Sequence, residues 1–296
     1  MKQIISFSRR TDGIAFYFDR LEKAIEEEII DVRNPINKKV SQVSLKPRDV
    51  AGFVLWSKDF QNLLQKWHIF SKYIPSTLSS NKIIPVYLHF TRNSIVKVIE
   101  PFAPSLERSF SQLNEITEII SPDHIMWRFD PIVFWKEDNV LFNNISDFKE
   151  IASQFASAGV RRCTISFVTY YAKVESRMKK YFFNYYKPTL KEIIKTTKEL
   201  LEIANQYKFK IYACCNPDLL KISQILQAHC IDGNYLSKLW KVKLSLAKDS
   251  GQREACGCTK SRDIGGYDKE WKCNHGCLYC YANPCSKAYE NAFHKI

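Results

Sequence analysis

The stretch from residue 124 to residue 168 decides the fold, and it contains three segments: HIMWRF (124–129), SDFKEIASQFASA (146–158) and CTISFV (163–168). The first and last segments are short, apolar and rich in β-branched or aromatic residues, which favours buried strands. The middle segment repeats its apolar residues with a helical period, and Gly159 stands where a helix commonly ends. The stretch therefore predicts a strand, a crossover helix and a second, parallel strand.

The same alternation continues on both sides of this unit. Further strands are expected near residues 5, 53, 86 and 212, and further helices over 14–28, near 60, over 106–120, over 190–205 and from 219. Thr189 and Glu192 form a capping pattern at the start of the helix over 190–205. Residues 30–45 interrupt the alternation and predict an inserted hairpin. The regular order predicts an α/β fold, a TIM-type (β/α) barrel that is full or partial, with an open doubly wound sheet as the alternative.

Composition bounds the domain organisation. The chain has 296 residues, 45% of them hydrophobic, which is enough for one large core. We predict a barrel domain over residues 1–250, because glycine and cysteine replace the helical pattern after Lys248. Residues 251–296 are then a cysteine-rich, metal-cluster-binding extension packed on the barrel. The sequence shows neither a signal-peptide pattern nor about 20 consecutive apolar residues, so a soluble, cytoplasmic protein without a membrane partner is expected.

The cysteines near the C-terminus indicate metal ligation. Cys273, Cys277 and Cys280 lie in the run CNHGCLYC. Three thiolates at this spacing can bind three irons of a cubic cluster and leave the fourth iron open for a ligand. Cys256 and Cys258, in EACGC, lie within reach and can add a fourth ligand that closes the site. Zinc bound by Cys256 or Cys258 together with the other three is therefore the alternative to an iron–sulfur cluster.

Polar residues at the ends of the predicted strands are the candidates for chemistry, because barrel enzymes use the carboxyl ends of their strands. Period-two alternation places these side chains on one face of each strand. The set is Lys58, His89, Arg128, Asp130, Ser166 and Cys214, joined by Arg9, Arg10 and Asp12 after the first strand. For each residue alone, a salt bridge or a helix cap is the alternative role. Cys214 and Cys215 are adjacent and should point to opposite sides of the sheet, one of them toward the barrel mouth.

The sequence resembles an uncharacterised family, the domain of unknown function numbered 1848. The resemblance rests on SRRTD, VRNP, RFDPI and ISFV, together with GQREACGC, SRDIGGY and CNHGCLYCYAN near the C-terminus. Separately, Cys273, Cys277 and Cys280, with Tyr279 before the last cysteine, are similar to the cluster motif of radical S-adenosylmethionine enzymes. In those enzymes the motif follows the first barrel strand, whereas here it follows the last predicted one.

The second resemblance implies a cofactor and a reaction class. It implies a 4Fe-4S cluster on Cys273, Cys277 and Cys280 whose open iron binds S-adenosylmethionine, and an external electron donor that starts cleavage to a 5′-deoxyadenosyl radical. Within that interpretation we assign Arg10, Asp12, Lys58, Arg128, Asp130 and Cys214 to catalysis on an unknown substrate, Cys214 as a hydrogen-atom donor. Arg9, Ser166 and Tyr279 are assigned to cofactor binding, and Cys256 and Cys258 complete the predicted metal-site residues.

The distribution of charge along the chain indicates a second class of function. The formal net charge is +13, and residues 172–210 contribute ten Lys/Arg against four Glu, with five Phe or Tyr residues between Tyr181 and Tyr186. Basic residues interleaved with aromatics suit nucleic-acid phosphates and bases, whereas a solvated helix with core aromatics is the plainer interpretation. A nucleic-acid-binding barrel with a structural zinc or iron–sulfur site is therefore the alternative function. A hydrolase that uses Asp130 and His89 ranks third.

Overall fold

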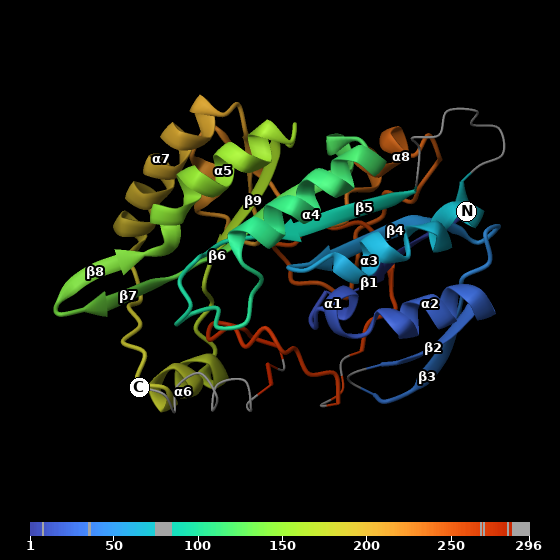
Figure 1. Ribbon diagram of the computed structural model, residues 1–296, viewed down its shortest axis with the longest axis horizontal. Helices are drawn as coiled ribbons and strands as arrows, with labels where there is room; N and C mark the ends of the chain where they lie inside the picture. Colours follow the sequence, from blue (N-terminus) through green and yellow to red (C-terminus); the bar gives the residue numbers. More distant parts are fainter. Residues whose placement is uncertain are drawn as a thin grey trace.

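A parallel sheet of eight strands forms the centre of the molecule (Figure 1). The computed structural model describes residues 1–7, 9–34, 37–74, 85–266, 268, 270–282 and 284–285. The strands are β1 (Gln3–Phe7), β4 (Val50–Ser57), β5 (Val86–Thr91), β6 (Ile125–Ile132), β9 (Arg162–Phe167), β10 (Lys210–Ala213), β11 (Ile225–Gln227) and β12 (Arg262–Asp263). The six strands expected from the sequence are confirmed, while β11 and β12 were not predicted.

Helices follow most strands. They are α1 (Gly13–Phe16), α2 (Phe18–Glu27), α3 (Gln61–Gln65), α4 (Leu106–Ile119), α5 (Phe148–Ser157), α6 (Ala172–Lys180), α7 (Leu190–Gln206) and α8 (Gly233–Leu239). Short 3₁₀ helices are η1 (Trp67–Tyr73), η2 (Pro122–His124), η3 (Asn144–Asp147) and η4 (Leu219–Lys221). The predicted capping box of Thr189 and Glu192 is present at the start of α7. Gly159, with φ +84°, follows the C-terminal end of α5.

Two helix predictions need correction. The helix expected over residues 14–28 is divided at Tyr17, whose φ of −139° is not helical, because the Asp12 side chain caps a separate short helix. The helix expected from Leu219 is only the 3₁₀ turn η4, and the helix after β11 is α8. The predicted inserted hairpin is confirmed as β2 (Ile29–Arg33) paired antiparallel with β3 (Val40–Ser44), and its Pro35 lies outside the described residues. A second hairpin, β7 (Phe134–Glu137) with β8 (Val140–Asn143), was not predicted.

The sheet order shows how the chain winds. The order is β11-β10-β9-β6-β5-β4-β1-β12, so the strands from β1 to β11 follow one another in one direction, and β12 returns to the opposite edge beside β1. A doubly wound sheet places about half of its strands on each side of the first one, whereas here six lie on one side of β1 and one on the other. Within the described part of the chain, β11 and β12 are not paired with each other, and the sheet does not close. The fold is therefore α/β with one large parallel sheet, and strand β12 comes from the predicted C-terminal extension.

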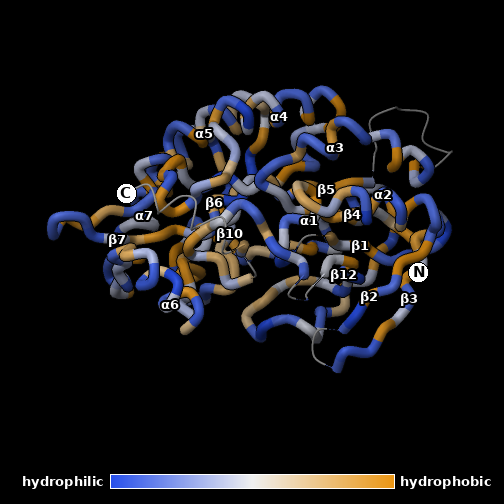
Figure 2. Tube along the Cα trace, turned by 60° about the horizontal axis from the view of Figure 1, so that its bottom comes forward, coloured by the Kyte–Doolittle hydropathy of each residue, from blue (hydrophilic) through white to orange (hydrophobic). Residues whose placement is uncertain are grey.

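The two faces of the sheet are covered differently. One face packs against α1, α2, α4, α5 and α7, and Figure 1 shows α4, α5 and α7 lying above the sheet. There, Trp127 of β6 stacks between Phe148 and Phe155 of α5, with ring centroids 4.9 and 5.0 Å apart. The helices carry polar residues on their outer surfaces, as the hydropathy colouring shows (Figure 2).

Residues after β11 cover the opposite face of the sheet. Val54, Tyr87 and Met126 on this face pack against Leu236 of α8 and against Trp240, which follows the helix. Gly52 permits the contact, because a Cβ there would lie 2.7 Å from the Trp240 ring. The segment from β11 onward therefore fills the side of the sheet that carries the predicted functional residues. No helix among the described residues is long and apolar enough to span a membrane.

Candidate functional site

The carboxyl ends of the parallel strands gather the predicted polar residues at one edge of the sheet. Asp12 follows β1, Lys58 follows β4, and Asp130 and Ser166 lie near the ends of β6 and β9. Because parallel strands end at the same edge, residues distant in the chain become neighbours there. The C-terminal cysteines arrive at this edge from the other end of the chain.

Cys273, Cys277 and Cys280 lie on one largely buried loop. The side chains of Cys273 and Cys277 are 9% and 6% exposed, and the three residues interact electrostatically with one another. Backbone hydrogen bonds fix the loop: Leu278 N donates to Ile99 O at 3.0 Å, and Cys285 N donates to Cys273 O at 2.9 Å. The loop therefore presents three thiols as one group, as their spacing predicted.

Asp12 connects this loop to the sheet. Its carboxylate caps α1 through Ala15 N at 3.0 Å and accepts hydrogen bonds from the Ser57 hydroxyl at 2.7 Å and from Lys58 N at 2.8 Å. Its Oδ2 also lies 2.9 Å from Nε2 of His275, which stands between Cys273 and Cys277. Asp12 is thus fully engaged with the protein, so its geometry is that of a positioning residue.

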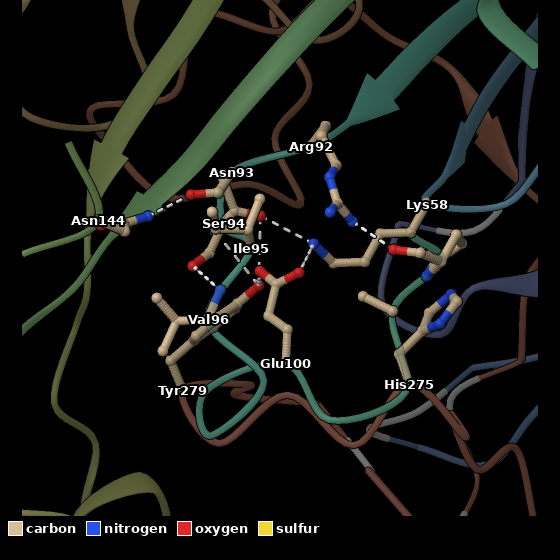
Figure 3. Close-up of polar contacts among 12 residues, drawn as sticks. Lys58, Arg92, Asn93, Ser94, Ile95, Val96, Glu100, Asn144, His275 and Tyr279 are labelled. Carbon is tan, nitrogen blue, oxygen red and sulfur yellow. Dashed lines mark hydrogen bonds and ion pairs between the residues drawn. The ribbon is translucent and has the colours of Figure 1, made fainter. Parts of the chain in front are cut away.

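A buried polar network lies beside the cysteine loop (Figure 3). Lys58 Nζ donates to Asn93 Oδ1 at 2.8 Å and to Glu100 Oε2 at 3.0 Å, and the Lys58 side chain is only 10% exposed. The Tyr279 hydroxyl donates to the other Glu100 oxygen, and Cys277 interacts electrostatically with Lys58 and Glu100. Tyr279, predicted to bind cofactor, is therefore engaged within the protein. Asn93 and Glu100 were missed by the sequence analysis, although Asn93 follows β5 as the other candidates follow their strands.

Cationic side chains surround Cys280. Arg177 of α6 donates to the carbonyls of Leu278 and Cys280 at 3.0 and 2.6 Å, and Lys173 and Lys58 interact electrostatically with the thiol. Burial raises the pKa of Cys280, while Arg177 and Lys173 oppose the increase. Burial also raises the pKa of Cys273 to about 12 and that of Cys277 well above its ordinary value. The thiolate forms therefore need a positively charged partner, which a bound metal centre provides.

A second polar group lies farther along the edge. The Arg128 guanidinium pairs with Asp130, and the Ser166 hydroxyl donates to the same carboxylate. Arg128 also donates to Sγ of Cys230 at 3.1 Å. Tyr281, directly after Cys280, interacts electrostatically with both Arg128 and Asp130. The predicted residues Arg128, Asp130 and Ser166 are thus brought together, and Tyr281 interacts both with this group and with Cys280.

Cys256 and Cys258 make their contacts elsewhere. Their side chains interact with each other, that of Cys256 also with Cys215 and that of Cys258 also with Cys230. Cys214 likewise interacts with Cys215 and Cys230. The prediction that Cys214 and Cys215 point to opposite sides of the sheet is wrong. Strand β10 ends at Ala213, and Cys215, with φ +49°, turns the chain back.

Arg9 and His89 face this second cysteine group. The Arg9 guanidinium donates to Ser261 Oγ at 2.9 Å and lies over the Trp56 ring, while Arg10 interacts electrostatically with Lys173 and Tyr281. His89 stacks on Trp56, and its Nε2 lies 2.8 Å from the carbonyl of Cys230. Burial lowers the pKa of His89 to about 3. His89 is therefore neutral and held by packing. This environment does not support the predicted hydrolase, in which His89 would act together with Asp130.

The three thiols of the loop fit an iron–sulfur cluster by donor type and by surroundings. They share one buried loop, and Lys58, Lys173 and Arg177 offset negative charge around them. In the part of the chain that the structure describes, no three His, Cys, Asp or Glu side chains are arranged as ligands of a single metal ion. A cubic cluster separates its cysteine ligands more widely than one ion does, because irons and sulfides lie between them.

Comparison with known proteins places the chain in a family. Residues 4–282 match the family described as a domain of unknown function (DUF1848), a range that includes all of the sheet except Gln3 of β1 and all three cysteines of the loop. No curated protein matches the chain, and no solved structure matches it. Because the match covers nearly the whole length, the chain belongs to the DUF1848 family.

Proposed function

We propose that this protein is an iron–sulfur enzyme of radical S-adenosylmethionine type, acting on an unknown substrate. The observation that carries the proposal is the position of Cys273, Cys277 and Cys280 on one buried loop at the carboxyl ends of β1, β4 and β5. The sheet is then a partial barrel, and the loop reaches its mouth from the C-terminus. Chain order does not matter to such a site, because the chemistry depends on where the ligands lie.

The residues around the loop have separate tasks in this proposal. Cys273, Cys277 and Cys280 hold a 4Fe-4S cluster, which when bound supplies the electron that cleaves S-adenosylmethionine, delivered by an external donor. Asp12 and His275 fix the loop, and Lys58 with Glu100 maintains charge balance beneath Cys277. Burial of the loop excludes water from the ligands.

Substrate and cofactor contacts are assigned to the groups beside the loop. Arg10 and Lys173 provide positive charge for a carboxylate, and Arg128, Asp130 and Ser166 offer donors and acceptors beside Tyr281. Arg9 and Tyr279 do not contact substrate or cofactor directly in this proposal. They support the shape of the site through their hydrogen bonds to Ser261 and Glu100.

The test is purification without oxygen, followed by iron and sulfide analysis and incubation with S-adenosylmethionine and a strong reductant. We expect release of 5′-deoxyadenosine and about four iron and four sulfide per chain more than in the variant Cys273→Ala/Cys277→Ala/Cys280→Ala. Cys273→Ala, Cys277→Ala and Cys280→Ala should each abolish this release, while Cys163→Ala, which alters a buried cysteine of β9, should preserve it. Release that persists without the three loop cysteines would contradict the proposal.

A further inference from the structure

Five cysteines outside the loop at Cys273 form a ring of neighbouring side chains. Each one interacts with the next in the order Cys214, Cys215, Cys256, Cys258 and Cys230, and Cys230 interacts with Cys214. Three separate segments supply them: the end of β10, the turn after β11, and the loop before β12. Half of the ten cysteines in the chain therefore meet at one place, to which nothing in the proposed radical chemistry assigns a role.

The backbone holds the three segments in fixed positions. Ala228 N donates to Ala213 O at 3.0 Å, Thr259 N to Ile231 O at 2.9 Å, and Cys214 N to Ile165 O at 3.0 Å. Gly257, between Cys256 and Cys258, lies against the ring of His229, where a Cβ would come within 2.7 Å of that ring. A side chain at residue 257 would therefore have to displace the His229 ring, so glycine suits the middle of this Cys-Gly-Cys turn.

Positive charge and N–H donors point at the sulfur atoms. Arg128 donates to Cys230 Sγ at 3.1 Å, and Ile231 N donates to Cys258 Sγ at 3.4 Å. Arg9 interacts electrostatically with Cys230 and Cys258, and Arg253 with Cys214 and Cys215. N–H donors directed at sulfur are typical of metal-bound thiolates, whose charge they stabilise. Four thiolates around a divalent ion, or around a cluster of charge +2, carry a net charge of −2; Arg253 offsets part of it, while Arg9 and Arg128 are shared with Asp249 and Asp130.

We propose that Cys214, Cys230, Cys256 and Cys258 hold a second metal centre, a zinc ion or a four-iron cluster ligated by cysteine alone. No three of the described side chains are already arranged around a single ion, so metal binding, which removes the thiol protons, has to turn these cysteines toward a common centre. Four protein ligands close such a site, which gives it a structural or electron-transfer role. Cys214 is then a ligand, and this replaces its predicted role as a hydrogen-atom donor.

The test uses the triple variant Cys273→Ala/Cys277→Ala/Cys280→Ala, because it lacks the ligands of the first site. The full-length protein is stripped with chelator and reductant, then loaded without oxygen with Zn²⁺ alone or with Fe²⁺ and sulfide, desalted and analysed. We expect about one zinc per chain or about four iron and four sulfide, and the metal of the protein as isolated identifies the resident one. Adding Cys230→Ser and Cys258→Ser should reduce metal retention by more than about tenfold, whereas adding Cys163→Ala should not.

A second measurement applies if the variants with substituted cysteines do not fold. Native protein is alkylated with and without metal, and the modified cysteines are identified by mass spectrometry. Metal should protect Cys214, Cys230, Cys256 and Cys258 at least several-fold. Equal alkylation in both states, or a folded triple variant that binds no more metal than its ring-substituted derivative, would overturn the proposal. Neither result depends on cleavage of S-adenosylmethionine, so failure of the first site is recognised separately.

Discussion

The Nε2 atom of His275 lies 2.9 Å from Oδ2 of Asp12, although 263 positions separate the two residues in the chain. Both side chains are nearly buried, with exposures of 4% and 8%. The same carboxylate accepts from Ser57 and from Lys58 N, so one residue joins the ends of β1 and β4 to the cysteine loop. The C-terminal motif is thereby fixed to the first strand of the sheet.

Asp12→Ala should therefore destabilise the protein strongly. Removing one member of a buried pair leaves polar groups without partners and costs about 3–5 kcal/mol in the free energy of unfolding. Urea denaturation followed by circular dichroism measures this change. Asp19→Ala is the matched control, because Asp19 is 93% exposed and its contact with Lys66 is at the surface; it should change stability by less than about 0.5 kcal/mol. Equal effects of the two substitutions would show that Asp12 has no anchoring role.

Lys58 and Glu100 should be energetically coupled. Glu100→Leu leaves the buried Lys58 ammonium without its carboxylate and should cost about 3–5 kcal/mol. The double variant Lys58→Met/Glu100→Leu removes both charges, so its cost should fall short of the sum of the single costs by about 0.5–3 kcal/mol. Urea unfolding of the four proteins completes the cycle. Strict additivity would mean that the two side chains do not interact.

His124 should make stability depend on pH. Burial lowers its pKa below the ordinary value of 6.5, and its Nδ1 lies 2.8 Å from Val86 O. The unfolded chain therefore binds this proton more readily than the folded protein, and stability falls as pH decreases through about 6.5. His124→Asn should reduce the loss of stability between pH 7.5 and pH 5 that thermal unfolding records. The exposed His68→Asn serves as control and should leave that loss unchanged.

Gly266 should tolerate no side chain. A Cβ at this position would lie 1.9 Å from Cε2 of Trp271, whose ring packs on Tyr17 at a centroid distance of 4.5 Å. Gly266→Ala should therefore lower the free energy of unfolding by about 1–3 kcal/mol through overpacking. At Gly251 the nearest atom to an added Cβ is 3.4 Å away, so Gly251→Ala is the control. Similar denaturation midpoints for both variants would contradict the packing argument.

The basic segment 172–210 remains a predicted nucleic-acid surface. Phe183 and Met178 are buried in a core cluster and Tyr185 stacks on Tyr170, whereas Phe182 is 95% exposed. The structure thus places Phe183 in the core, as the plainer interpretation expects, and leaves the lysines to be tested.

If the lysines contact phosphates, affinity for single-stranded RNA or DNA should fall with salt by about one logarithmic unit per contact. Changing Lys179, Lys180, Lys187 and Lys191 to Gln should weaken binding at about 0.15 M salt. Fluorescence anisotropy measures both effects. Equal affinity of the two proteins, or none, would leave a small molecule or peptide as the substrate class.

Local sequence patterns determined most elements of the fold. Strands β1, β4, β5, β6, β9 and β10 were predictable because their apolar runs are short and bounded, and α7 because its capping box is local. The short strands β11 and β12 carry too few residues for a periodic signal. Cys273, Cys277 and Cys280 were also predictable as a group, since a short loop keeps its own residues together whatever surrounds it.

Only the tertiary structure decided how distant residues combine. Cys256 and Cys258 are close in sequence to Cys273, yet their side chains are neighbours of Cys215 and Cys230. Asn93 and Glu100 became partners of Lys58 because strands β4 and β5 are neighbours that end at one edge. Spacing along a chain fixes contacts within a loop. Contacts between loops depend on which strands pair and on which residues the core buries. Neither property can be predicted from a single segment of the sequence.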